Sequence, residues 1–194
     1  MPFGAQKKQV CQENAAKQIF AEMSKTIDIL KEFPVREVDK RASCAIVIPC
    51  HTPDLKPIQK YSLDYSMAIL GSRDYFFVLP ESLDESYYVT NFKQVAIVRF
   101  PDRFFTSSQA YSELCLDDMF YERFASTHEF MLILQTDAIV LRDELNYWCS
   151  QPWDYIGAPW PREMDNWPVG KKFRVLLDQD CFSGESKRCV PLIY

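Results

Sequence analysis

The residues best suited to chemistry stand where apolar runs end. Asp137 lies between Phe130–Leu134 and Ala138–Leu141, two stretches typical of a protein core. An unpaired carboxylate inside a core is costly, or it shifts its pKa and becomes neutral. Asp137 is therefore expected at the mouth of a sheet. There it contacts a metal or a ligand, or else it caps a turn.

Other polar residues follow apolar runs in the same way. Gln135 precedes Asp137 by two residues, a spacing that places both on one side of an extended chain. Its amide contacts a ligand or bonds to a neighbouring strand. Thr52, and with it the apolar Pro49, comes after the run Cys44–Ile48, where folds of this kind hold the nucleoside of a substrate.

Two basic side chains accompany these segments. His51 also follows the first apolar run, where it is either a ligand contact or an ordinary surface residue. Arg99 stands near the end of the run Val95–Phe100, where it neutralises a phosphate or pairs with a nearby acid.

The elements that must position these residues alternate along the chain. Apolar runs predict strands over 44–49, 74–80, 95–100 and 130–134. Helices are predicted over 58–70, 107–124 and 143–149, with a short extended piece at 155–156. Because the strands are apolar on both faces, we expect an α/β, Rossmann-like, mostly parallel sheet with helices on both faces. Ligands bind at the carboxyl ends of such strands, a rule that selects residues 49–52, 99–102 and 135–137, which can converge on one crevice.

The first part of the chain has a different pattern. Apolar residues at helical spacing predict a helix over 5–31, which lies against the main domain or forms an oligomer contact. We therefore expect a helical appendage over 1–40 and an α/β domain over 41–194. The N-terminus has charges throughout, unlike a signal peptide, and no run approaches the roughly 20 apolar residues of a membrane span.

Composition disfavours several functions. The net charge is −5 without clustered Lys or Arg, which disfavours a nucleic-acid partner. None of the five glycines forms a phosphate-binding loop after the first strand, which argues against a dehydrogenase or a P-loop enzyme. Seven cysteines without a Cys-x-x-Cys pair, and only two histidines, disfavour a zinc site. The odd cysteine count favours reduced thiols and a cytoplasmic location.

What remains is a crevice that uses carboxylates. A carboxylate at a strand end can hold a divalent metal, which neutralises a diphosphate leaving group. Sugar-nucleotide transferases of mixed α/β type need this function. In this chain the third position of an Asp-x-Asp site is Ile139, so Mn²⁺ or Mg²⁺ would need further ligands or water.

Three motifs resemble a bacterial and fungal family of uncharacterised glycosyltransferase-like domains. They are Gln-x-Asp-Ala at 135–138, Asp-Glu-Leu-Asn-Tyr-Trp-Cys at 143–149 and Asp-Tyr-Ile-Gly-Ala-Pro-Trp at 154–160. The resemblance covers roughly residues 42–160 and implies a nucleotide-diphospho-sugar transferase fold of the GT-A kind. Family members usually continue with a Gly-rich Phe-Ser stretch that this chain lacks, so we expect a divergent or truncated C-terminus.

Within these motifs three residues have alternative roles. Asp154 is a ligand or acceptor-side base, or it orders its loop. Trp160 offers a flat face for stacking on a sugar or base, or it covers the core. Asp143 opens a helix, which favours a capping role.

The resemblance implies a glycosyltransferase. It would move a sugar from a nucleotide-diphospho-sugar to a glycan or lipid-linked acceptor, with Asp137 at the diphosphate. The alternative is a non-catalytic relative that binds a sugar nucleotide, a glycan or a protein partner.

Overall fold

The structure is a computed structural model that describes residues 21, 35, 38, 41–157 and 188–189. The chain divides into two units, Met1–Arg36 and Glu37–Tyr194, and the strands and helices named below lie in the second. The helix predicted over residues 5–31 falls almost entirely outside the described residues, as does Trp160. Both stay predictions.

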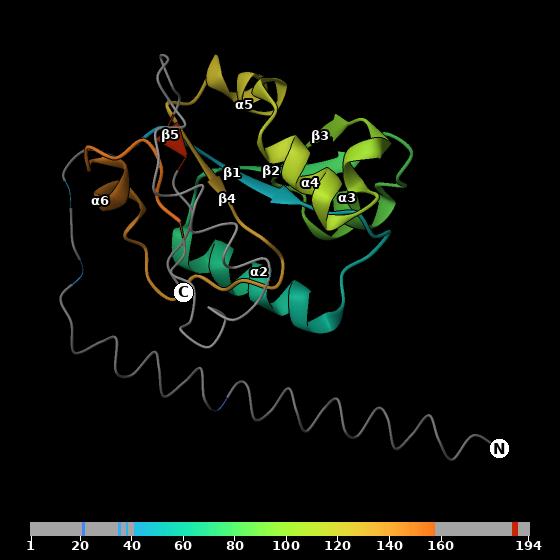
Figure 1. Cartoon of the computed structure of the whole chain (residues 1–194). Coiled ribbons are helices and arrows are strands. Elements are labelled where there is room, and N and C mark those ends of the chain that lie inside the picture. Colours follow the sequence, from blue (N-terminus) through green and yellow to red (C-terminus); the bar gives the residue numbers. More distant parts are fainter. Residues whose placement is uncertain (1–20, 22–34, 36–37, 39–40, 158–187, 190–194) are drawn as a thin grey trace, which may run out of the picture. The chain divides into compact units, whose positions relative to one another are not determined.

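The second unit is built on an all-parallel sheet with the strand order β3-β2-β1-β4-β5 (Figure 1). Its strands are β1 Cys44–Pro49, β2 Asp74–Pro80, β3 Val95–Phe100, β4 Phe130–Ile133 and β5 Arg188–Cys189. The first three strands begin and end as predicted, β4 is one residue shorter, and β5 was not predicted. The prediction of an α/β, Rossmann-like fold is confirmed.

Helices fill the connections between these strands. They are α2 Pro57–Leu70, α3 Ser86–Asn91, the 3-10 helix η1 Asp102–Phe105, α4 Ser108–Cys115, α5 Asp118–Ala125 and α6 Leu145–Cys149. A proline occupies the first turn of α2, and Gly71 ends the helix with a φ of 68° that favours glycine. The side chain of Ser107 caps α4 by accepting a 3.1 Å hydrogen bond from Ala110 N.

The single helix predicted over 107–124 is wrong, because two helices occupy this range. The first ends at Cys115, and the Asp117 carboxylate then accepts a 2.9 Å hydrogen bond from Met119 N. This side-chain cap starts α5 and stops the two helices from merging. Between them Leu116 is 74% exposed.

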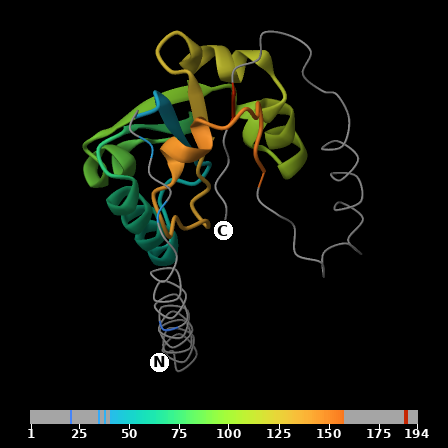
Figure 2. The same ribbon diagram turned by 90° about the vertical axis from the view of Figure 1, so that its left-hand side faces the viewer.

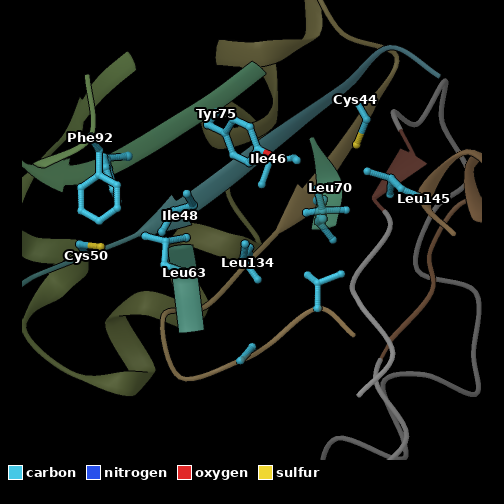
Figure 3. Close-up of a cluster of buried hydrophobic side chains, with 14 of the residues drawn as sticks. Cys44, Ile46, Ile48, Cys50, Leu63, Leu70, Tyr75, Phe92, Leu134 and Leu145 are labelled. Carbon is cyan, nitrogen blue, oxygen red and sulfur yellow. The ribbon is translucent and has the colours of Figure 1, made fainter. Parts of the chain in front are cut away.

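The alternating side chains of each central strand enter two different cores. Ile46 and Ile48 of β1 are fully buried on one face, beside Leu63 and Leu70 of α2 (Figure 3). Burial of each such aliphatic side chain contributes about 1.5–3 kcal/mol. Together these contacts hold α2 against one face of the sheet.

The other residues of β1 supply the second core. Ala45 and Val47 are fully buried against Leu114 of α4 and against Phe120 and Phe124 of α5. The two views of the ribbon agree with this layering, with α2 on one side of the sheet and α4 and α5 on the other (Figures 1 and 2). Helices therefore cover both faces, as predicted for a parallel sheet.

After β4 the chain turns back along α2 as an extended return segment, residues 136–143 (Figure 1). Two buried serines one helical turn apart hold its backbone. Ser62 donates its hydroxyl to Ala138 O, and Ser66 accepts a 2.9 Å bond from Val140 N. The segment thus gains from a helix the hydrogen bonds that a strand would gain from a sheet.

Candidate functional site

The strand order creates a switch point between β1 and β4. From β1 the chain moves outward through β2 to β3, and it then returns to pair β4 with the other side of β1. Val47 pairs with Ile133, and Leu134 N donates to Val47 O at 2.9 Å, so both strands end at the same level. Ligands of open parallel sheets bind at such points. The predicted segments 49–52 and 135–137 therefore lie side by side, and we call them the switch edge.

The loop on the β1 side of the switch edge has fixed backbone positions. Cys50 N donates to Val78 O at 2.9 Å, and the hydroxyl of the buried Tyr88 donates to Thr52 O at 2.7 Å. The Thr52 hydroxyl donates to Asp54 O at 2.8 Å, and His51 is exposed. Tyr88, which the sequence did not single out, thus positions the predicted residue Thr52.

Cys50 is the one buried thiol beside this loop among the described cysteines. It is 4% exposed, and burial raises the pKa of its thiol to about 12, with the nearby Tyr88 hydroxyl opposing the rise. The thiolate is the nucleophilic form of cysteine, and at neutral pH this thiol keeps its proton. Cys50 therefore acts as a small core residue.

The turn on the β4 side is tied to the start of α2 by Gln59. The side-chain oxygen of Gln59 accepts from Lys56 N at 3.1 Å, and its side-chain nitrogen donates to the Thr136 hydroxyl at 3.0 Å. Within the turn, Ala138 N donates to Gln135 O at 3.1 Å. Together with the serines of α2, these bonds fix the backbone on both sides of Asp137.

Asp137 itself is exposed at this turn. No residue in the described part of the chain hydrogen-bonds or ion-pairs with its carboxylate, so a turn-capping role has no structural support. Its backbone is fixed while its charge is available. This combination suits ligand contact, because little entropy is lost when a pre-positioned group binds.

The described residues do not build a divalent-metal site around Asp137. Among them, no three His, Cys, Asp or Glu side chains gather so that they could hold a metal ion. Mn²⁺ and Mg²⁺ need several oxygen ligands, and one carboxylate supplies too few.

Arg99 lies away from the switch edge. It is in β3, which β2 separates from β1 by two strand spacings, roughly 10 Å. Its guanidinium donates to Pro80 O, Glu81 O and Leu83 O at 2.8–3.0 Å and pairs with Glu85. Of the two predicted roles, the structure shows the ion pair. Residues 99–102 are thus not direct neighbours of the switch edge, and their convergence with it on one crevice stays a prediction.

Asp143 has the capping role that its position predicted. It accepts a 3.2 Å bond from Leu145 N at the start of α6 and forms a two-bond ion pair with Arg73 at 3.0 and 3.1 Å. Arg73, at 4% side-chain exposure, is almost fully enclosed. The pair ties the return segment to the start of β2.

Asp154 is exposed and follows α6 in the chain. Asn146 of α6 accepts a 3.1 Å bond from Ala42 N, which holds this helix near the amino end of β1 (Figure 1). The switch edge lies at the opposite ends of the strands. The predicted acceptor-side role of Asp154 therefore has no described link to Asp137 and stays a prediction.

In the comparisons with known proteins, one family model matches part of the chain, and that family has no known function. A family described as "Protein of unknown function (DUF5672)" matches residues 94–184, a little under half of the chain. This range includes β4 and the Asp137 side of the switch edge. No curated protein and no solved structure matches the chain. In the part of the chain that the structure describes, every helix is too short or too polar to cross a membrane.

Proposed function

We propose that this domain is a cytoplasmic glycosyltransferase of the GT-A kind that binds a nucleotide-diphospho-sugar at the switch edge. The observation that carries the proposal is Asp137, an exposed carboxylate on a fixed backbone at the point where such sheets bind ligands. Cys44, Cys50, Cys115 and Cys149 carry free thiols, which supports a reducing compartment.

In the proposed reaction a hydroxyl of a glycan or lipid-linked acceptor attacks the anomeric carbon of the sugar. The bond between that carbon and the diphosphate oxygen breaks, and its electron pair leaves with the nucleoside diphosphate. The hydroxyl proton passes to a general base. The described residues of the switch edge do not supply this base, because Asp154 follows a helix held near the opposite ends of the strands. Asp137 accepts hydrogen bonds from hydroxyl groups of the bound donor, since an ionised carboxylate is a pure acceptor.

One observation favours a second candidate, a non-catalytic relative that binds a sugar nucleotide, a glycan or a protein. The described residues bring a single acid to the switch edge, whereas transfer with a base requires another group. The two candidates differ in turnover. A transferase releases nucleoside diphosphate when an acceptor is present, and a binding protein returns the donor intact.

The test is calorimetry with a panel of UDP-, GDP- and CMP-sugars, with and without Mn²⁺. We expect one donor to bind wild type and to lose at least about tenfold in affinity in Asp137→Asn, the loss of one hydrogen bond to a charged group. Glu129→Gln is the matched control, because this exposed carboxylate precedes β4 at the opposite edge. The proposal fails if no donor binds, or if Asp137→Asn binds as well as Glu129→Gln.

A further inference from the structure

Tyr111 of α4 has a buried hydroxyl without a hydrogen-bond partner among the described residues. Three other tyrosines of the domain donate their hydroxyls to backbone oxygens. Tyr75 donates to Gly71 O at 2.8 Å, Tyr88 to Thr52 O at 2.7 Å and Tyr121 to Cys115 O at 2.5 Å. Buried polar groups are nearly always bonded, and one that is not lowers the stability of the fold. The Tyr111 hydroxyl therefore calls for an explanation.

The surroundings of Tyr111 connect it to the switch edge. Its ring packs on the same core as Ile133, the last residue of β4. Burial raises the pKa of its phenol far above the ordinary value, the neighbouring Cys115 adds to the rise, and the Gln135 side chain opposes it. Gln135 and Cys115 are thus close, yet neither meets the geometry of a hydrogen bond. A buried donor stands next to an exposed amide.

We propose that Tyr111 and Gln135 form a hydroxyl–amide pair that binds the neutral sugar part of the donor. The Gln135 amide nitrogen donates to a sugar hydroxyl, and its oxygen accepts from the Tyr111 hydroxyl. Tyr111 is then a positioning residue that acts through Gln135. The inference rests on the proposed function. It adds that the β4 side of the switch edge binds the sugar of the nucleotide-sugar.

The charges at the edge favour a sugar over a phosphate here. Tyr111 and Gln135 are neutral, and Asp137, two residues after Gln135, is an acid that repels a bare phosphate but accepts from hydroxyls. The guanidinium of Arg99, predicted as a phosphate contact, already bonds three carbonyls and Glu85. In the free protein the unpaired Tyr111 hydroxyl destabilises the fold. When the ligand binds, it orients the Gln135 amide so that the amide oxygen accepts from this hydroxyl, which removes the cost.

The first arm of the test measures thermal stability without ligand. Tyr111→Phe removes a hydroxyl that has no partner, so the melting temperature is expected to stay the same or rise. Tyr121→Phe is the matched control. It makes the same change in the same core, but it breaks the bond to Cys115 O and should lower the melting temperature by about 2–4 °C. A fall of similar size in Tyr111→Phe would show a structural hydroxyl and overturn the inference.

The second arm measures binding of the nucleotide-sugar that wild type binds and of its nucleoside diphosphate. Tyr111→Phe is expected to weaken the nucleotide-sugar about tenfold and to leave the diphosphate unchanged. Gln135→Ala should cause a similar loss, and the double variant no further loss. If the affinity losses of the two single variants add up in the double variant, Tyr111 and Gln135 do not act as a pair. Equal losses for the nucleotide-sugar and the nucleoside diphosphate would also contradict the proposal.

The two proposals fail in distinguishable ways. If wild type binds no nucleotide-sugar, the proposed function and this inference fall together. If Asp137→Asn loses binding while Tyr111→Phe binds like wild type, only the Tyr111–Gln135 pair is wrong.

Discussion

The hydrogen bond between Ser66 and Val140 gives the sharpest stability prediction, because both partners are buried. Ser66 is 0% exposed and Val140 is 1% exposed, and Val140 N donates to the serine hydroxyl at 2.9 Å. Ser66→Ala leaves this backbone N–H without a partner and without water. The desolvation cost of such an orphaned donor is about 1–3 kcal/mol.

Urea denaturation of the second unit within the full chain measures this cost. Ser66→Ala is expected to lower the free energy of unfolding by about 1–3 kcal/mol, since the small side chain leaves almost no cavity. Ser72→Ala is the control, because Ser72 is exposed just beyond the end of α2. Hydrogen exchange should show that the Val140 amide loses protection before the amides of β1 do.

The reasoning predicts a second effect on function. The return segment begins at the turn that holds Asp137, so its release should also weaken donor binding in Ser66→Ala. If Ser66→Ala is as stable as Ser72→Ala, within about 0.5 kcal/mol, the bond does not hold the segment, and the structural account of Asp137 is refuted.

Two further perturbations test the fold. In urea denaturation, Gly71→Ala should lower the free energy of unfolding by about 1–3 kcal/mol, because φ is 68° at this position. An added Cβ meets no atom within 4 Å, so the whole cost comes from the backbone conformation. A cost below about 0.5 kcal/mol would contradict this. Burial raises the pKa of Cys50 from 9.0 to about 12, so the folded state keeps a proton that the unfolded state loses. The stability that this proton contributes is complete below pH 9 and is lost as the pH rises toward 12. Cys50→Ala should therefore make the free energy of unfolding fall less steeply over this pH range. An unchanged pH profile would argue against the burial effect.

The central strands were predictable because their pattern is local. Cys44–Pro49 and Asp74–Pro80 are apolar on both faces, and a parallel sheet covered on both sides requires that pattern. The break between α4 and α5 was missed because the spacing of apolar residues continues across it. The Asp117 cap was a local signal for that break, and it outweighs the apparent periodicity.

The candidate site was predicted in part. Asp137, Gln135, Pro49 and Thr52 were expected at strand ends, and β1 and β4 place them together. Arg99 was expected with them on the same rule, but the rule does not say which strands are neighbours. Strand order is set by long-range pairing, and here it places β3 two spacings from β1.

By itself the sequence determined strands β1 to β4, the parallel α/β class and the position of Asp137 after a buried strand, because these follow from the spacing of apolar residues within short segments. Only the tertiary structure decided what surrounds Asp137. Gln59 and Ser66 of α2 bond to Thr136 and Val140, which lie 77 and 74 residues away in the sequence. Tyr111, which lies near Gln135, belongs to α4. Such contacts depend on how helices pack on the sheet, and no local pattern encodes that packing.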